Sequence, residues 1–555
     1  MMKLTGGITR SVLLASAALM IASPALAEGD PIRPITIWAR TQAANPQAYQ
    51  AAQLIAQAWQ DLGLEVEVRG VPRTQQSDLV WYKRDEWDTT MWQMVGRPER
   101  SDPDELVYNL FHSSTAESGY NFVGYVNPEY DKVAEAQRVE MDEAKRQELV
   151  KQSQAIIAED QPYMLLVYPT KVFAIDKTVW NPDSMVEQPG LGIKNFWTFI
   201  NAEPVGEQKD MIVNSSDEMN AINPLYISGA TDSWVTELIW DRLMRIGPDG
   251  LPQPWAAESY EWLDPTTIEL KIRQGMKWHD GKPVTVDDVV FSFEAPATGD
   301  EAPMYKPFVE GITSIEAVDD RTVRMKLAQP NAAFLTSSLA KINLIPKHIW
   351  EPILADLVTK PENAEQIVEE SRIGSGPFKY ADWTLQQQVV LEANPDHWSA
   401  PKMDRWILRI IPNVEAALGM LRSGEVNFMS DYTGDPQILL DVAQEDGDLE
   451  ILDSVDIGFQ FLAFNLRHAP FDDPHFRRAL SFAVPRELMV AAAWNGYSVP
   501  SNSIISPALP FWYNEKVLPI ETGEEVAKAE LAKGGYELID GVLHYPDGVT
   551  EQYAK

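Results

Sequence analysis

Apolar side chains recur at two different spacings along the chain and predict alternating strands and helices. From Ala51 to Leu62 they fall on one face of a helix, which Gly63 ends. Ile35 to Ala39 before this helix and Leu64 to Val68 after it have the pattern of strands. A strand, an amphipathic helix and a second strand predict a right-handed crossover between parallel strands. We therefore expect an α/β unit here.

The same signals return in the middle of the chain. Thr231 to Leu243 has helical spacing, and Thr267 to Ile272 alternates polar and apolar side chains as a strand does. Thr285 and Asp288, three residues apart, have the spacing of a capping box that opens a further helix. These elements predict a second region that mixes helices and strands.

Residues 1–27 have the pattern of a secretory signal peptide. Lys3 and Arg10 precede the apolar run from Val12 to Ala22, and small residues surround the expected cleavage site after Ala27. An apolar run of about 11 residues is too short to cross a hydrocarbon core of about 30 Å, so a membrane anchor is the weaker interpretation. The sequence therefore predicts export to the periplasm.

Length, charge and cysteine content narrow the function classes. A chain of 555 residues exceeds one ordinary domain, so two or three lobes are expected. The absence of cysteine excludes disulfides, thiol catalysis and zinc–thiolate sites. A formal net charge of −36 opposes binding to nucleic acid, so no nucleic-acid partner is expected. The acidic surface could favour cationic substrates, although its simpler role is solubility.

Two long stretches carry a resemblance to a known family. Gly250 to Tyr260 and Gln274 to Val289 resemble the signature of the extracellular solute-binding proteins of family 5, the peptide- and nickel-binding components of ABC importers. Gly374 to Tyr380 and Ala417 to Asn427 resemble further parts of the same family. The resemblance implies a two-lobed, periplasmic-binding-protein-like α/β fold. It has mixed sheets flanked by helices, an extra subdomain and a hinge between the lobes.

The family's segments come in an unusual order in this chain. The part that resembles the late third of a family member comes first, and the family's natural ends are joined near Ala202 to Asp210. Because the family is covered once, without duplication, we interpret the chain as circularly permuted, which is physically mild when both pairs of ends lie at the surface. A fusion of two incomplete binding proteins or a faulty gene model is the alternative. The expected divisions are residues 1–27 as signal peptide, 31–168 as lobe 2, 169–249 as lobe 1, 250–372 as an extra subdomain of lobe 1, 373–464 as lobe 1 and 465–555 as lobe 2.

The resemblance also implies candidate ligand-binding residues. Peptide-binding members place an acid in the loop that corresponds to residues 92–104, where it pairs with the α-ammonium of the ligand. Asp102 and Asp104 would take this role, and Arg97 or Arg100 would hold a carboxylate, although the Arg97-Pro-Glu-Arg insertion departs from the common pattern. Lower-ranked candidates for the same cleft are Trp92, Asn121, Tyr125, Ser228 and Thr231.

Two apolar strands are the expected crossings between the lobes, where ligands bind. They are Met164 to Tyr168 and Phe459 to Asn465. Phe459 and Phe461 share one face of the second strand and Asn465 ends it, so these three residues could form the floor of the cleft. Plain core packing is the equally weighted alternative for the two aromatic side chains.

Enzyme signatures are absent from the sequence. No two of the seven histidines stand four residues apart on a helix, and no nucleophile elbow or phosphate loop occurs. We therefore expect no catalytic residue, metal or cofactor, although a secreted hydrolase with a carboxylate pair stays open as an alternative. The expected function is that of a monomeric periplasmic substrate-binding component that delivers peptides to an inner-membrane ABC permease. An oligosaccharide or another small solute is the alternative ligand.

Overall fold

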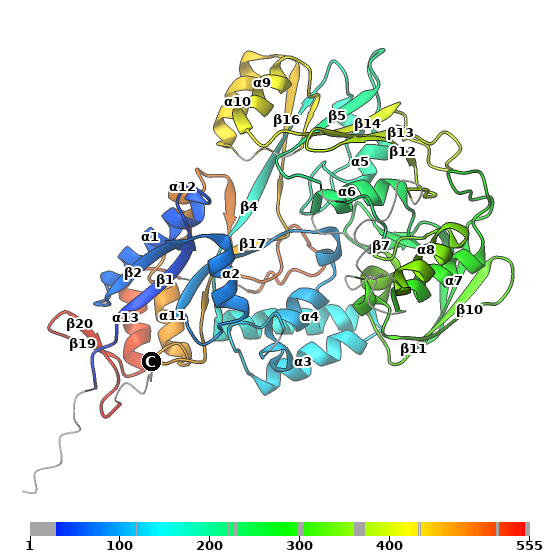
Figure 1. The fold of residues 1–555 in the computed structure, drawn as a ribbon. Helices are drawn as coiled ribbons and strands as arrows, with labels where there is room; N and C mark the ends of the chain where they lie inside the picture. The colour runs from blue at the N-terminus through cyan, green and yellow to red at the C-terminus, as the bar shows by residue number, and fades with distance from the viewer. Residues whose placement is uncertain are drawn as a thin grey trace, which may run out of the picture.

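One long strand, β4 (Tyr163–Asp176), runs through both lobes of the protein (Figure 1). Its first half pairs antiparallel with β17 (Phe459–Phe464) and β18 (Ser498–Pro500) in lobe 2. Its second half pairs with β15 (Phe428–Met429) and β16 (Leu449–Val455) in lobe 1.

The computed structural model describes residues 29–117, 119–219, 221–225, 230–297, 305–359, 372–430, 432, 434–517 and 521–549. The expected signal peptide lies outside these ranges.

Lobe 2 is built on a sheet that β1 extends. The strand β1 pairs in parallel with β2, with Ile35 opposite Val66, and also with β3, so the predicted crossover is confirmed. Helix α1 lies between β1 and β2; Asn45 caps it by accepting from the Ala48 N–H, and Trp59 is buried on its inner face. Besides β17 and β18, the elements of lobe 2 are β1 (Ile35–Arg40), α1 (Pro46–Gln60), β2 (Val66–Val71), α2 (Arg73–Trp81), β3 (Thr89–Met94), η1 (Pro98–Ser101), η2 (Glu105–Asn109), η3 (Ser113–Thr115), α3 (Pro128–Val139), α4 (Glu143–Asp160), α11 (Pro474–Phe482), α12 (Arg486–Ala493), α13 (Glu524–Lys533), β19 (Glu537–Ile539) and β20 (Val542–His544).

Lobe 1 has a mixed sheet in the order β12, β13, β14, β5 and β15, which continues into β4. Here β5 pairs in parallel with both β14 and β15. Besides β15 and β16, its elements are η4 (Pro182–Ser184), α5 (Phe196–Asn201), β5 (Asp210–Ser215), α6 (Ala230–Ile239), β6 (Met244–Ile246), β7 (Pro252–Pro254), β12 (Phe378–Thr384), β13 (Gln388–Ala393), β14 (Arg405–Ile410), α9 (Val414–Arg422) and α10 (Pro436–Glu445).

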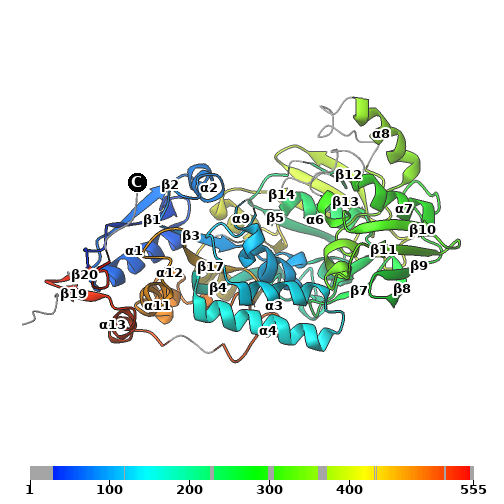
Figure 2. The same ribbon diagram turned by 90° about the horizontal axis from the view of Figure 1, so that it is seen from below.

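A separate sheet in the order β10, β11, β9 and β8 forms the subdomain that packs on lobe 1 (Figure 2). The predicted capping box is confirmed, since Thr285 Oγ1 accepts from the Asp288 N–H and the Asp288 carboxylate accepts from the Thr285 N–H. The elements are β8 (Ala257–Asp264), β9 (Thr267–Ile272), α7 (Val286–Glu294), η5 (Ala295–Ala297), η6 (Lys306–Phe308), β10 (Ile312–Ala317), β11 (Thr322–Leu327), η7 (Leu335–Leu339) and α8 (Lys347–Thr359).

Two apolar clusters sandwich the lobe 2 sheet, which fixes its strands in place. One lies between the sheet and helices α1 and α11 and includes Ile37, Trp59 and Phe476. The other lies on the opposite face and includes Phe111 and Phe461. Lobe 1 and the subdomain share one continuous cluster. Within the described ranges, no helix is both long and apolar enough to cross a membrane.

The two ends of the described chain meet in lobe 2. The Ile32 N–H donates to the Leu543 carbonyl oxygen (2.8 Å), and the Tyr545 N–H donates to the Asp30 carbonyl oxygen (2.9 Å). Pro31 and His544 form a β-bridge. The first described residues therefore pack beside the β19–β20 hairpin, at the left of Figure 1.

The structure corrects one expected boundary. We expected residues 373–464 to belong to lobe 1, but β17 pairs with β3 along its whole length, from Phe459 opposite Met94 to Phe464 opposite Thr89. The chain therefore enters lobe 2 before β17 rather than after it. The other expected divisions stay predictions.

Candidate functional site

The lobes are joined at a crossing where β4 runs beside the segment between β16 and β17. The Asp456 N–H donates to the Pro169 carbonyl oxygen (2.8 Å), and Lys171 Nζ lies 3.0 Å from Asp456 Oδ2. Gly96, just after β3, packs against the same carboxylate, and a Cβ there would lie 1.8 Å from Asp456 Oδ1. A larger residue at position 96 would therefore displace the Asp456 carboxylate from its contact with Lys171.

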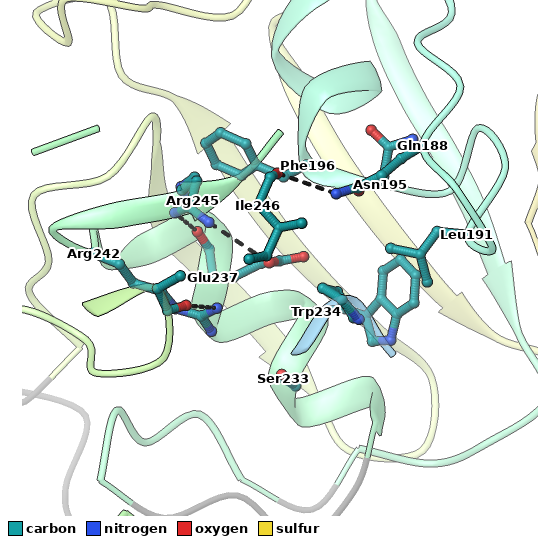
Figure 3. Close-up of a pocket in the computed structure, with 12 residues that line it drawn as sticks. Gln188, Leu191, Asn195, Phe196, Ser233, Trp234, Glu237, Arg242, Arg245 and Ile246 are labelled. Atoms are coloured by element: carbon teal, nitrogen blue, oxygen red, sulfur yellow. Dashed lines mark hydrogen bonds and ion pairs between the residues drawn. The ribbon is translucent and has the colours of Figure 1, made fainter. Parts of the chain in front are cut away.

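A pocket lies in lobe 1 (Figure 3), at the place where Pro98 of lobe 2 reaches it. Pro98 in η1 contributes to it from lobe 2, and Trp234 and Glu237 on α6 contribute from lobe 1. Its volume is about 50 Å³, whereas pockets for small-molecule ligands usually have about 300–1,000 Å³. In this conformation the pocket has room for a few water molecules or one side chain. A larger ligand would require the lobes to move apart.

Two guanidinium groups, those of Arg242 and Arg245, line the pocket together with the Glu237 carboxylate. Arg245 stacks on Phe196, 3.5 Å from its ring centre, and its Nη1 lies 3.6 Å from the Glu237 carboxylate. Burial, together with the neighbouring charge of Arg242, lowers the pKa of Arg245 to about 9. Arg242 donates to Asn343 Oδ1 (3.1 Å). Both guanidinium groups are thus engaged by partners within the protein, Arg245 also through the Glu237 carbonyl oxygen and Arg242 also through that of Ala340.

The structure assigns the two candidate acids of the loop to the interior of lobe 2. Both carboxylate oxygens of Asp102 accept from Arg146, at 2.7 and 2.8 Å, and both side chains are buried. Asp104 accepts from Gln137 Nε2 (2.6 Å) and lies 3.1 Å from Arg138 Nε. We expected a carboxylate that is available to an α-ammonium group. In the structure both charges are already paired within the protein, and the role of either acid as a partner of the ligand's α-ammonium group stays a prediction.

The arginines that pair with these two acids also make a contact between the lobes. The Ala332 N–H, next to the subdomain sheet, donates to the Arg138 carbonyl oxygen (2.7 Å) at the end of α3. Arg146 Nη1 donates to the Ala332 carbonyl oxygen (3.4 Å). Figure 2 shows α3 and α4 side by side, reaching toward this subdomain. Asp102 therefore acts here by orienting Arg146.

The two candidate arginines of the loop differ from each other. Arg100 donates to Glu105 (2.7 Å) and to the Val95 carbonyl oxygen, so it fixes the loop itself. Arg97 is exposed immediately before Pro98, the residue of this loop that lines the pocket. Its role as a carboxylate partner stays a prediction.

Asn121 and Tyr125 are structural. Asn121 is fully buried and bonds the backbone on both sides of its loop, including the Tyr125 carbonyl oxygen (2.8 Å). The Tyr125 hydroxyl donates to the Asp160 carboxylate. The structure therefore does not bring them to the pocket. Trp92 is half-buried against Trp81 and contributes instead to a pocket in lobe 2.

The aromatic residues of the second crossing strand belong to the core. Phe461 stacks on Tyr163 with ring centres 4.2 Å apart, and Phe459 packs beside it. Asn465 donates to the backbone of Trp87 (2.8 Å) and so fastens the end of the strand. Both phenylalanines are fully buried in the apolar cluster on this face of the sheet, which favours the alternative of plain core packing.

The lobe 1 candidates have different outcomes. Ser228 lies outside the described residues. Thr231 is buried in the first turn of α6. The residues that sequence reasoning missed follow on the same helix: Ser233, Trp234 and Glu237 line the pocket. The sequence does show that Trp234 and Glu237 stand three residues apart on a predicted helix. Residues at this spacing share one face of a helix, so they could have been recognised as neighbours.

Comparison with known proteins decides the family. The family model described as bacterial extracellular solute-binding proteins, family 5 middle, matches residues 252–553, more than half of the chain. The chain belongs to this family. The resemblance to family 5 that was predicted from the stretches Gly250 to Tyr260 and Gln274 to Val289 is therefore confirmed.

Curated relatives of the chain are named for different ligands. The chain is 28% identical over 352 residues to the oligopeptide-binding protein AppA of Bacillus subtilis, covering 62% of each chain. It is 26% identical to the dipeptide-binding protein of Escherichia coli, covering 60% of this chain and 64% of the relative. It is also 26% identical to heme-binding protein A of Haemophilus influenzae, covering 56% and 59%. The chain thus spans about three fifths of the length of these family 5 relatives.

A solved family structure was also matched. The structure of AppA from Bacillus subtilis in complex with a nonapeptide is 26% identical to this chain. The match covers 61% of this chain and 67% of that chain, with a TM-score of 0.46.

Proposed function

We propose that this family 5 chain is the substrate-binding component of an ABC importer and binds peptides between its two lobes. The observation that carries the proposal is the pocket beside the crossing of β4 with the β16–β17 segment, lined from both lobes. The oligopeptide- and dipeptide-binding relatives favour peptides over other solutes. A cleaved signal peptide would export the monomeric chain to the periplasm, where it would deliver its ligand to an inner-membrane permease.

Binding would work by closure of the lobes. A ligand that contacts both Pro98 and α6 stabilises the closed state relative to the open one, because only the closed state offers both sets of contacts. The small volume of the pocket fits a closed state. The contact of Ala332 with Arg138 would be made and broken with each cycle.

Equilibrium dialysis against a pool of random tri- to pentapeptides tests this function. The protein is first unfolded and refolded to remove bound ligands, and retained compounds are identified by mass spectrometry. We expect peptides to be retained and thermal stability to rise, by about 2.7 kcal/mol at a hundredfold excess over Kd. Trp234→Ala, in the pocket, should weaken retention at least tenfold. Trp262→Ala, in the subdomain and away from the pocket, is the matched control.

Other results, from this dialysis or from a parallel dialysis against an oligosaccharide pool, would contradict the proposal. Retention of compounds from an oligosaccharide pool, with no peptide retained, would change the ligand class. Conversion of the peptides or sugars into products would instead indicate a secreted hydrolase. Equal losses in Trp234→Ala and Trp262→Ala would remove the pocket from the binding site.

We also propose that the chain is a circularly permuted family member. Three observations support this: the family model matches only residues 252–553, strands β1 to β3 complete the sheet that contains β17, and Asp30 contacts Val549. The Asp30 N–H donates to the Val549 carbonyl oxygen (3.2 Å), so only a short linker would join these positions. The joined ends of the family would lie in the exposed segment around Gly206.

A further inference from the structure

The subdomain of lobe 1 meets lobe 2 at Ala332. The Ala332 N–H donates to the Arg138 carbonyl oxygen (2.7 Å), and the Ala332 carbonyl oxygen accepts from Arg146 Nη1 (3.4 Å). We call these two hydrogen bonds the subdomain contact. Ala332 lies between β11 and η7, whereas Arg138 lies in the last turn of α3 and Arg146 in the first turn of α4. None of these three residues lines the pocket beside Pro98, so the subdomain contact is separate from that pocket.

The subdomain holds Ala332 in a fixed turn. Asn331 Oδ1 accepts from the Ala333 N–H (3.0 Å), and the Asn331 carbonyl oxygen accepts from the Phe334 N–H (3.1 Å). Phe334 is buried beside Trp262 of β8. Hydrogen bonds from an asparagine side chain to the backbone two residues on stabilise turns of this kind. Because the turn is anchored in the core of the subdomain, the peptide groups of Ala332 face lobe 2 in a defined arrangement.

The lobe 2 side of the contact uses the end of a helix. The last four carbonyl groups of an α-helix have no donor within the helix. Helix α3 ends at Val139, so the Arg138 carbonyl oxygen is one of these groups, and the Ala332 N–H supplies its donor. The Arg138 side chain is also held in place, since its guanidinium lies 3.9 Å from the centre of the Tyr108 ring. When the lobes separate, this carbonyl would have water as its donor instead.

Both arginines of the subdomain contact are positioned by the loop that reaches the pocket. Asp102 accepts two hydrogen bonds from Arg146, and Asp104 lies 3.1 Å from Arg138 Nε. The Asp104 N–H donates to Asp102 Oδ1 (2.9 Å), which fixes the two acids relative to each other. Pro98, which lines the pocket, belongs to the same loop. A shift of this loop would therefore move the two arginines that meet the subdomain.

A further residue places the subdomain close to α4. Tyr260 belongs to β8 of the subdomain, and Glu143 is the first residue of α4. Burial and the negative charge of Glu143 raise the pKa of the Tyr260 hydroxyl. The subdomain and the start of α4 thus face each other at more than one residue.

We propose that the subdomain responds to the ligand: the subdomain contact stabilises the closed state, and the loop of residues 97–105 links this contact to the pocket. The inference rests on the proposed function, because it assumes closure of the lobes around a ligand. A ligand that fixes Pro98 would also fix Asp102 and Asp104, and with them the groups that meet Ala332. Because coupling between two sites is reciprocal, the contact would in turn strengthen ligand binding. Arg146 is then a positioning residue that acts from outside the pocket.

Hydrogen exchange at the Ala332 amide tests the proposal, because this N–H is protected while it bonds to the Arg138 carbonyl oxygen. Mass spectrometry with fragmentation to single residues measures the exchange rate. The first arm uses the refolded protein without ligand. In the Asp102→Leu/Arg146→Met variant, which lacks the pair that positions the contact, we expect exchange at Ala332 to be about fivefold faster, the effect of losing about one net hydrogen bond.

Two controls separate this result from a general change in stability. The Arg324→Met/Glu269→Leu variant removes an ion pair within the subdomain (2.6 Å) and should leave exchange at Ala332 unchanged. The Ala333 N–H donates to Asn331 Oδ1 inside the same turn, so its exchange should be the same in every variant. Faster exchange at both amides would indicate a loosened turn rather than a lost contact, and would contradict the proposal.

The second arm adds the pool of tri- to pentapeptides. We expect exchange at Ala332 to slow about tenfold in the parent protein, which is a typical strength of coupling between two sites. The slowing should be smaller in Trp234→Ala, which changes the pocket. Ala332→Pro lacks the N–H of the contact and leaves Asp102 and Arg146 in place, so it should release retained peptides about fivefold faster than the parent.

Three results would overturn the inference. They are equal exchange at Ala332 in the parent and in Asp102→Leu/Arg146→Met, retention of peptides without slower exchange at Ala332, and equal release of peptides by Ala332→Pro and the parent. The first arm uses no peptide. If the parent retains no peptide, the proposed function fails, while the first arm still decides whether Asp102 and Arg146 control the subdomain contact.

Discussion

Replacing Asp102 with alanine is expected to lower the free energy of unfolding by about 3–5 kcal/mol, because it leaves the buried Arg146 charge without its partner. The two side chains are only 9% and 5% exposed and make two hydrogen bonds with each other. Arg146 also donates to Gln137. Chemical denaturation monitored by tryptophan fluorescence measures the change.

Two comparisons make this prediction specific. Glu129→Ala breaks a pair with Lys132 whose side chains are more than two-thirds exposed, and should cost less than about 1 kcal/mol. The double variant Asp102→Leu/Arg146→Met, which removes both charges, should recover much of the loss. The prediction would be wrong if Asp102→Ala and Glu129→Ala were equally stable. If Asp102→Ala also lost affinity for peptides, Asp102 would be a ligand-binding residue.

Residues 210–549 alone, which include nearly all of the region 252–553 that the family model matches, are expected not to fold. This fragment lacks β4, the partner of β15, β16, β17 and β18, and it lacks β1 to β3. Without these strands, the apolar side chains of β17 lose the core that they share with Tyr163 and Phe111. Circular dichroism and limited proteolysis measure the outcome, and we expect no cooperative unfolding transition.

A rearranged chain is the control for this fragment. It starts at Glu207, runs to Val549, continues through a short glycine–serine linker to Asp30 and ends at Gly206. This order keeps every strand pair, so we expect a melting temperature within a few degrees of that of the parent and the same ligand preference. A fragment that folds cooperatively alone, or a rearranged chain that does not fold, would favour the fusion of two incomplete proteins over a permuted fold.

The local elements could be predicted from the sequence because their signals are local. The end of helix α1 at Gly63, the capping box of Thr285 and Asp288, and the alternation in β9 each depend on signals within a few residues. The course of β4 could not be predicted in the same way. Its second half, from Thr170 to Asp176, pairs with residues about 280 positions away, and no local pattern encodes that contact.

The candidate site was less predictable than the fold, for a physical reason. An acid in a loop has the same appearance in sequence whether it meets a ligand or a buried arginine. Asp102 meets Arg146, which stands 44 residues away in the chain. In the same way, Phe459 and Phe461 alternate on a strand, but only the packing of the folded chain shows that both faces of β17 are covered by apolar clusters. The role of the α6 residues in the pocket could not be predicted either. It depends on the packing of η1 against β6, which brings Pro98 near α6.

The distance between the lobes tests the central claim most directly. The chain has no cysteine, so Lys145→Cys on α4 and Glu261→Cys on β8 can be labelled specifically with nitroxides. Both positions are exposed and lie on opposite sides of the contact between Ala332 and Arg138. Double electron–electron resonance should show a longer distance in the ligand-free protein and a shorter one after the peptide pool is added. A distance that stays the same while peptide binds would contradict closure of the two lobes around the ligand.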